Sequence, residues 1–373
     1  MKKSLAILLT ALCSAFCSRQ PESPALIDAS RFDSELDGQV VGLYTIRGGG
    51  LTLQATNFGG RVVSLFVPDN TGTLVDVVLG HPTLEEYVNY AQERFLGAVV
   101  GPVANRITNA SFTVDGQTYK LSANHGGKGT LHGGFKGLDS VVWDVKALTD
   151  SSLTLHYLHA DGQEGFPGNL DIEMTYTLTH VGGWSIDYVA TTDKTRPVNI
   201  SNHPYFNLSG GKGTCEDYEM YVDAFAIIGI DGLDVIEDPI DIKGTAFDYL
   251  TPHPVKDALG SDDEQIRRGR GFDHNYCINW TPGQTALVAS LYNPANGIFL
   301  EVFSDQPGLQ VYSGQYFTGE EDGKYDQKLA YRGSFTFETQ NWPDAPNKAS
   351  FPDCYLKPGE KYSHHCEYRF SIK

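Results

Sequence analysis

The dominant pattern along this chain is the alternation of apolar and polar residues. The clearest examples are residues 51–55, 152–157, 173–178, 185–189 and 334–339. Because successive side chains of a strand point to opposite faces of a sheet, this alternation predicts half-buried β-strands. Turn-forming sequences separate such segments, at Asp115-Gly116, Asp161-Gly162, Gly182-Gly183 and residues 294–297. The pattern therefore predicts a chain built mainly from antiparallel strands.

Helical periodicity is scarce. Residues 83–87 are the one segment that could open a short helix, with Thr83 as the N-cap and Glu86 at the third helical position. The chain shows neither an alternation of strands with helices nor a repeat of fixed period. We therefore expect a single domain over residues 25–373, folded as a large antiparallel β-sandwich with long functional loops.

The N-terminus has the composition of a targeting segment. Lys2 and Lys3 precede a short apolar stretch at residues 5–12, which is too short to span a membrane and is typical of a secretory signal peptide. Cys13 or Cys17 could be the lipid-attachment cysteine of a bacterial lipoprotein, with residues 18–24 as a tether. The alternative is an ordinary cleaved leader. Residues 1–24 therefore predict export to the periplasm or to a lipid-anchored place on the cell envelope.

The net charge of the chain limits the kinds of ligand that it can bind. The chain carries 28 Lys and Arg against 46 Asp and Glu, a formal net charge of -18. Nucleic acids are disfavoured, since their binding depends on Lys and Arg, and no basic run stands in the mature region. A neutral ligand fits this balance, and a membrane would be reached only through an N-terminal lipid.

Cysteine usage leaves disulfides open. The mature region contains Cys215, Cys277, Cys354 and Cys366. An oxidising compartment permits disulfides, but the spacing does not determine any pairing, and it resembles no zinc ligand set. The segment 364–366, His-His-Cys, lies in an alternating terminal stretch where neighbours point to opposite faces. We therefore expect no metal site there.

The most informative residue for chemistry is Glu338, which stands among Phe335, Phe337 and Trp342. A carboxylate in an apolar environment is poorly solvated, so its pKa rises towards the range of a general base at neutral pH. Far upstream, His203 stands in an equally aromatic segment and precedes Pro204, which favours an extended backbone. The two together predict an acid–base pair, although His203 could equally be a buried histidine that bonds the backbone.

Four further segments contain polar residues suited to binding sugar hydroxyls. They are Asn105-Arg106, His132 beside two glycines, Asp273, and Gln310 within an apolar strand. Each has a structural alternative: an arginine–carboxylate pair, an exposed turn, an Asx-turn and a satisfied core amide. His274 would face away from Asp273 in an extended segment, so we leave it out. The chain has no phosphate loop, no dinucleotide fingerprint and no nucleophile elbow.

Taken in order, these segments closely resemble the galactose mutarotase (aldose 1-epimerase) family. The resemblance covers about residues 43–372, and it rests on the blocks 57–61, 104–107, 130–134, 164–168, 202–208, the segments around Asp273 and Glu338, and 356–362. It implies the large β-sandwich of that family and interconversion of the α and β anomers of free aldohexoses such as galactose or glucose. The preferred aldose stays open.

The resemblance also implies roles for particular residues. Glu338 falls at the position of the general base and His203 at that of the general acid. The implied substrate-binding residues are Asn105, Arg106, His132, Tyr205, Asp273 and Gln310. No cofactor is implied, a structural calcium ion is not excluded, and we expect a monomer. The rival hypotheses are a sugar-binding module without catalysis, an epimerase of phosphorylated hexoses, and a structural sandwich at the cell surface.

Overall fold

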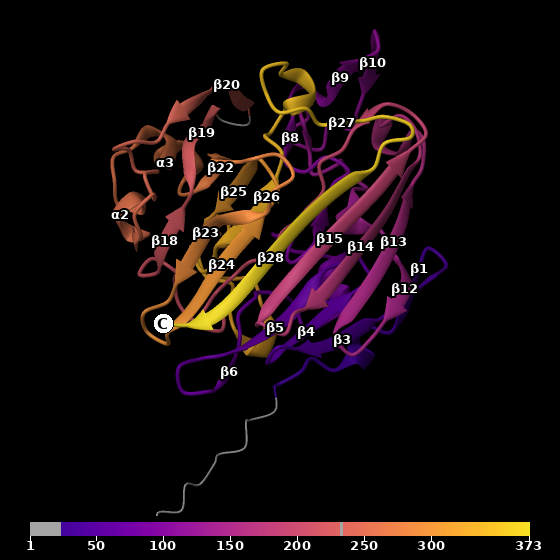
Figure 1. The fold of residues 1–373 in the computed structure, drawn as a ribbon. Helices are drawn as coiled ribbons and strands as arrows, with labels where there is room; N and C mark the ends of the chain where they lie inside the picture. The colour runs from indigo at the N-terminus through magenta and orange to yellow at the C-terminus, as the bar shows by residue number, and fades with distance from the viewer. Residues whose placement is uncertain (1–23, 232–233) are drawn as a thin grey trace, which may run out of the picture.

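The computed structural model describes residues 24–231 and 234–373. The expected leader, including Cys13 and Cys17, lies outside these residues. The long strands form one broad sheet that is easily followed in Figure 1. This nine-stranded antiparallel sheet contains, in spatial order, β12 (Asp144–Leu148), β13 (Ser152–His159), β14 (Leu170–Leu178), β15 (Gly183–Thr192), β28 (Tyr362–Ile372), β24 (Ile298–Ser304), β23 (Ala286–Tyr292), β18 (Glu219–Val222) and β21 (His253–Pro254).

Two smaller antiparallel sheets complete the main layers. One has the order β20 (Asp234–Asp241), β19 (Ala224–Asp231), β22 (Asp273–Ile278), β25 (Gly308–Tyr312) and β26 (Thr336–Gln340). The other has the order β3 (Leu43–Gly48), β4 (Leu51–Thr56), β5 (Val62–Pro68) and β6 (Leu74–Asp76). Two-stranded ribbons join β1 (Ser34–Leu36) to β2 (Gln39–Val41), β9 (Ser111–Val114) to β10 (Gln117–Lys120), β8 (Arg106–Ile107) to β11 (Thr130–Leu131), β16 (Arg196–Pro197) to β27 (Tyr355–Leu356), and β7 (Val99–Val100) to β17 (Ser201–Asn202).

The main core lies between the nine-stranded sheet and the two smaller sheets. A single apolar cluster joins Met174 of β14 to Leu65 of β5 and to Phe337 of β26, so all three sheets share it. Along β14 the buried residues alternate with exposed or half-buried ones, so one face of this strand faces the core. Both smaller sheets therefore pack against that same face, and the predicted β-sandwich is confirmed.

The alternation predicted most strands correctly but misjudged two of them. Half-buried strands occur as expected at β13 and β14. The prediction was wrong for β4 and β26, where every residue is buried. In β4 the polar Gln54 points inward and accepts a hydrogen bond from the backbone of Ile27 at 2.9 Å. In β26 the polar face borders a cavity that is described below.

Local signals for turns and caps are confirmed. Asp115 and Gly116 close the β9–β10 hairpin with positive φ values of 50° and 75°, as a tight hairpin turn requires. The predicted helix is α1 (Leu84–Val88), in which the Thr83 hydroxyl lies 2.6 Å from the Glu86 carboxylate and accepts the Glu86 backbone N–H. The short helices α2 (Lys256–Leu259) and α3 (Glu264–Gly269) were not predicted.

The four cysteines of the described residues are buried free thiols, so no disulfide joins any of them. Burial raises the pKa of Cys366 to about 12, which keeps this thiol protonated. The neighbouring histidines point to opposite faces of β28, as the alternation predicted. His364 is buried and contacts the Ile200 carbonyl, whereas His365 contacts Asp187 on the outer face. These side chains therefore do not converge on a metal.

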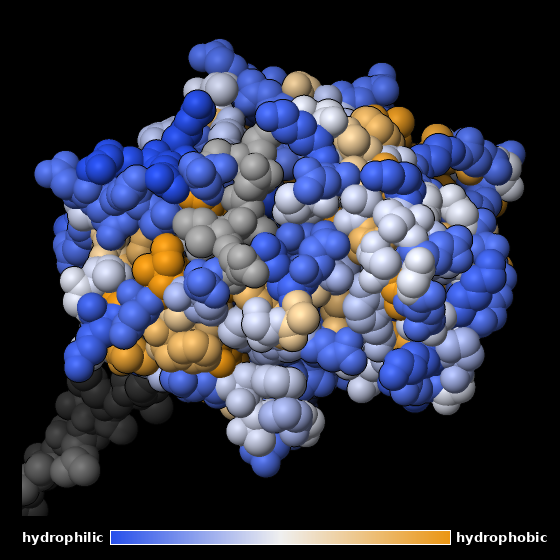
Figure 2. Space-filling view, turned by 90° about the horizontal axis from the view of Figure 1, so that it is seen from above, coloured by the Kyte–Doolittle hydropathy of each residue, from blue (hydrophilic) through white to orange (hydrophobic). Residues whose placement is uncertain are grey.

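The face of the molecule seen from above is largely polar. Figure 2 shows hydrophilic side chains over most of the face seen from above, with apolar side chains in small groups. Among the described residues, no helix is long and apolar enough to cross a membrane.

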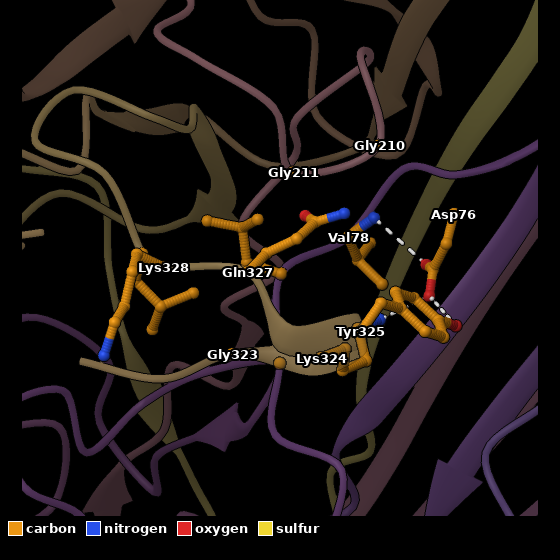
Figure 3. A pocket seen from close by; sticks show the side chains of 12 residues that line it. Asp76, Val78, Gly210, Gly211, Gly323, Lys324, Tyr325, Gln327 and Lys328 are labelled. Carbon is orange, nitrogen blue, oxygen red and sulfur yellow. Dashed lines mark hydrogen bonds and ion pairs between the residues drawn. The ribbon is translucent and has the colours of Figure 1, made fainter. Parts of the chain in front are cut away.

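A buried ion pair anchors the long loop between β25 and β26. Lys324, in this loop, lies 2.5 Å from Asp76 at the end of β6, and its ammonium also donates to the Val63 carbonyl of β5. The Tyr325 hydroxyl donates to the same carboxylate at 2.9 Å, as Figure 3 shows. Burial lowers the pKa of Lys324 despite the adjacent Asp76. The loop is thereby tied to the four-stranded sheet.

We expect Lys324→Met to lower the free energy of unfolding by about 3–5 kcal/mol, because it leaves the Asp76 carboxylate buried without its cation. Urea unfolding of the two proteins measures the difference. Lys328→Met is the matched control, since Lys328 in the same loop forms an exposed ion pair with Asp322 that is worth about 0–1 kcal/mol. Equal losses in the two variants would contradict this account.

Candidate active site

All eight residues singled out from the sequence line one cavity of about 380 Å³. They are Asn105, Arg106, His132, His203, Tyr205, Asp273, Gln310 and Glu338. They come from segments far apart in the chain, and the fold brings them together. His274 is absent from the lining, and its side chain contacts Gln265 of α3 instead.

One wall of the cavity is the polar face of the five-stranded sheet. Glu338 of β26 pairs directly with Gln310 of β25, which in turn pairs with Asn275 of β22. Directly paired residues share a face, and so do residues two apart along a strand, which adds Asp273. The intervening residues, such as Phe337, point into the core. Alternate residues of these strands therefore face the cavity and the apolar core.

A second wall is the segment that follows β17, and backbone hydrogen bonds fix its position beside β26. The His203 N–H donates to the Ala98 carbonyl at 2.8 Å. Phe206 and Phe335 exchange two backbone hydrogen bonds of 2.8 Å. Phe206 lies three residues after His203, and Phe335 lies three residues before Glu338. This short bridge sets the imidazole and the carboxylate side by side.

His203 and Glu338 are in direct contact. Nε2 of His203 lies 3.3 Å from Oε1 of Glu338, and the two side chains are only 6% and 2% exposed. The Nδ1 atom of His203 and the Oε2 atom of Glu338 are buried and have no hydrogen-bond partner in the protein. Both side chains therefore retain polar atoms with which a ligand could bond.

Burial pushes the two pKa values in opposite directions. It lowers the pKa of His203 to about 3, because the charged imidazolium is poorly solvated. It raises the pKa of Glu338 well above its ordinary value, and the nearby Asp273 adds to this effect. Such a pair titrates as a unit, and over a wide range of pH it holds one proton in total. A pair with one proton can accept at one atom while it donates at the other.

His132 contributes a hydrogen-bond donor to the site. Its Nδ1 accepts the backbone N–H of Asn105 at 3.2 Å. Burial lowers the pKa of His132 well below its ordinary value, so the ring is neutral and its one proton must be on Nε2. The Nε2–H group is then free to donate towards the cavity.

This protonation state argues against a metal at the site. Ligand atoms of His132, His203 and Glu338 all lie within 4.8 Å of one another, which is close enough to suggest a metal site. A metal on Nε2 of His132 would need the proton on Nδ1, where metal-binding histidines normally donate to an acceptor. Here Nδ1 faces a backbone donor instead. The donor set therefore fits a proton-transfer site better than a metal centre.

A closed ring of hydrogen bonds holds the remaining polar side chains. Asn105 donates to Gln310 at 2.9 Å, and Gln310 donates to Asp273 at 2.7 Å. Arg106 donates to Asp273 at 3.1 Å and to Asn105 at 3.2 Å. The arginine–carboxylate pair and the satisfied amide considered from the sequence are thus both present, and both border the cavity. The ring fixes the direction in which each group faces a ligand.

Several lining residues escaped the sequence analysis. Tyr312 lies two positions after Gln310 in β25, so the alternation itself could have placed it on the cavity face. Glu93 and Phe95 belong to the loop after α1, where no periodic pattern exists. Tyr316 comes from the long loop that Lys324 anchors. Thr318 of the same loop exchanges hydrogen bonds with Gln92, which also lines the cavity.

Comparison with known proteins places this site in a family. The family model described as aldose 1-epimerase matches residues 42–369. The chain is 36% identical to the galactose mutarotase of Bos taurus, covering 91% of this chain and 97% of that protein. It is 33% identical to the aldose 1-epimerase of Escherichia coli (strain K12), covering 90% and 96%. The chain belongs to the aldose 1-epimerase family.

Solved structures agree with this assignment. The structure of an aldose epimerase homologue from C. elegans matches with a TM-score of 0.81 and 27% identity, and covers 89% of this chain and 99% of that one. The structure of galactose 1-epimerase from Lactobacillus acidophilus NCFM matches with a TM-score of 0.79 and 26% identity, covering 91% and 97%. The resemblance stated from the sequence is confirmed.

We predict that His132 carries its proton on Nε2 at neutral pH. Long-range ¹H–¹⁵N NMR of the labelled protein distinguishes the two neutral tautomers, and His132→Gln identifies the signals. The expected pattern is a protonated Nε2 and an unprotonated Nδ1, because Asn105 donates to Nδ1. A proton on Nδ1, or an imidazolium at neutral pH, would show this reasoning to be wrong.

Proposed function

We propose that this protein is an aldose 1-epimerase that interconverts the α and β anomers of free aldohexoses, with Glu338 and His203 as its proton carriers. The supporting observation is the buried contact of 3.3 Å between the two side chains at the wall of the cavity. Membership of the aldose 1-epimerase family supports the same reaction. The names of the relatives point to galactose as one substrate.

In the proposed reaction, Glu338 takes the proton of the C1 hydroxyl while His203 gives a proton to the ring oxygen O5. The C1–O5 bond breaks, the electrons of the O1–H bond form the aldehyde carbonyl, and the ring opens. Rotation about C1–C2 presents the other face of the carbonyl. Closure then reverses both transfers, with protonated Glu338 returning a proton to O1 and neutral His203 taking the proton from O5.

The total number of protons on the pair stays constant through the cycle. For ring opening the proton must be on His203, and with the open-chain sugar it is on Glu338. Burial of both side chains favours the second arrangement, in which neither group is charged. This environment offsets part of the cost of the open-chain state, and no step needs an oxidant, a covalent adduct or a cofactor.

Binding of the sugar must separate the two side chains. Nε2 and Oε1 are in direct contact, so the hemiacetal has to enter between them. O5 can then accept from His203, and the C1 hydroxyl can donate to Glu338, which replaces the contact that is lost. The Nε2–H group of His132 and the ring of Asn105, Arg106, Asp273 and Gln310 offer donors and acceptors for the other oxygens.

The charges around the cavity favour an uncharged sugar over a phosphorylated one. Each arginine of its lining is already paired: Arg94 with Asp139, Arg106 with Asp273, and Arg268 with Glu264. A phosphate group would have to compete with these carboxylates for its cations. Glu93 and Glu338 add further acidic groups to the same lining.

The setting of the enzyme is also part of the proposal. We infer export to the periplasm or to a lipid-anchored place on the cell envelope from residues 1–24, and a monomer that needs no cofactor. Free monosaccharides would then be available as substrates outside the cytoplasm.

We expect Glu338→Gln to reduce catalysis by about 10²–10⁴-fold while sugar binding persists, since the amide keeps the shape of the side chain and loses its basicity. Polarimetry on freshly dissolved α-glucose, α-galactose and α-xylose measures the activity, and titration calorimetry measures binding. Glu173→Gln, on the exposed face of β14, is the control and should behave as wild type. Full activity in Glu338→Gln would remove this residue from the mechanism.

The dependence of kcat/KM on pH should follow the protons of the pair. At low pH the pair gains a second proton, with the pKa of His203 lowered to about 3, so the acid limb lies well below that of an ordinary histidine. At high pH the pair loses its last proton, and the raised pKa of Glu338 moves this limb upward. Activity is therefore expected to be flat around neutral pH. An acid limb near pH 6.5 would contradict the assignment of His203.

A further inference from the structure

The imidazole of His203 is held by two aromatic rings. Phe95 stacks on it with ring centroids 5.9 Å apart and planes inclined by 27°. Tyr205 stacks on it at 4.9 Å and 28°. The reach of Nε2 towards Glu338 depends on the plane of this ring, so whatever fixes Phe95 and Tyr205 also fixes the direction of proton transfer.

Glu93 contacts both of these aromatic residues. Its Oε1 accepts the backbone N–H of Phe95 at 2.9 Å. The buried Tyr205 lies beside the same carboxyl group, and its hydroxyl lowers the pKa of Glu93. The Glu93 side chain thus links the loop after α1, which contains Phe95, to the segment after β17, which contains Tyr205. Both of these rings stack on the imidazole of His203.

Glu93 forms no direct ion pair within the described part of the chain. Burial and Glu321 raise its pKa, whereas the Phe95 N–H, Tyr205 and Arg61 lower it. The adjacent Arg94 is engaged by Asp139, with Nε 2.7 Å from the carboxylate. Glu93 also lines the cavity, together with Glu338. Glu93 is half-buried, and no direct ion pair explains the position of its carboxyl group.

We propose that Glu93 is a positioning residue for His203: it holds Phe95 and Tyr205 against the imidazole and places a negative charge beside the Glu338–His203 pair. This proposal rests on the proposed epimerase function. The charge acts on Glu338, whose pKa is raised by burial first, then by Asp273 and by Glu93. Glu93 therefore affects both the geometry and the proton affinity of the pair without touching the reacting atoms.

Two substitutions separate these effects. Glu93→Ala removes the hydrogen-bond acceptor and the charge, and we expect kcat to fall about 10- to 100-fold, the loss typical of a small misplacement of a catalytic group. KM should change little, because the ring of Asn105, Arg106, Asp273 and Gln310 is intact. Glu93→Gln keeps an acceptor and loses only the charge. It should keep most of kcat, while the alkaline limb of the pH profile moves to lower pH.

Tyr205→Phe tests the path through the aromatic ring. It removes the hydroxyl that interacts with Glu93 and keeps the ring that stacks on His203. If Glu93 acts through Tyr205, the double variant Glu93→Ala/Tyr205→Phe loses much less than the product of the two single losses. The control is Glu85→Ala, an exposed carboxylate of α1, which should leave kcat and the pH profile unchanged.

An NMR titration of His203 provides a readout that is independent of turnover. Loosening Phe95 and Tyr205 admits water, so in Glu93→Ala the pKa of His203 should rise from about 3 towards that of an ordinary histidine. The proposal would be overturned if Glu93→Ala had the same kcat, the same alkaline limb of the pH profile and the same pKa of His203 as the wild type. A raised KM with unchanged kcat would also overturn it, because Glu93 would then be a sugar contact. Absence of epimerase activity in the wild type would instead refute the proposed function, and the titration would still test Glu93.

Discussion

The site depends on one backbone contact between two segments that are distant in the chain. Phe206 and Phe335 exchange two hydrogen bonds of 2.8 Å, and from this bridge the chain runs back to His203 on one side and forward to Glu338 on the other. A shift of this register by one residue would turn Glu338 into the core and Phe337 into the cavity. The 3.3 Å contact between imidazole and carboxylate is therefore a property of the sheet and its neighbour, and not of the two side chains alone.

Burial supplies the chemistry that this geometry makes possible. The same exclusion of water lowers the pKa of His203 and raises that of Glu338, so the pair keeps one proton and can move it either way. The nine-stranded sheet covers one side of the core, and the aromatic rings of Phe95 and Tyr205 cover the imidazole itself. Ring opening and ring closure use the same two groups in opposite roles, so the pair must be able to move its proton in both directions.

Much of this arrangement could be predicted from the sequence, for reasons that differ between residues. Alternation identified the strands, the apolar surroundings singled out Glu338 and Gln310, and a capping pattern identified α1. The same alternation missed that both faces of β26 are buried. The polar face of this strand borders a cavity instead of open solvent, and only the packing of the sheets determines this. Tyr312 could have been placed by its spacing from Gln310. Glu93 and Phe95 could not, since a loop has no period and their partners come from another part of the chain. The protonation of His132 depends on a single backbone N–H, which only the structure reveals.

Exchange between the α and β anomeric protons, followed by NMR on galactose and on glucose at equilibrium, tests the central claim most directly. The comparison is between wild type, Glu338→Gln, His203→Asn and the double variant. Two carriers that move one proton between them act as a unit, so the double variant should exchange about as slowly as the slower single variant. Losses that multiply in the double variant, or rapid exchange in either single variant, would show that the two side chains do not share the proton transfers.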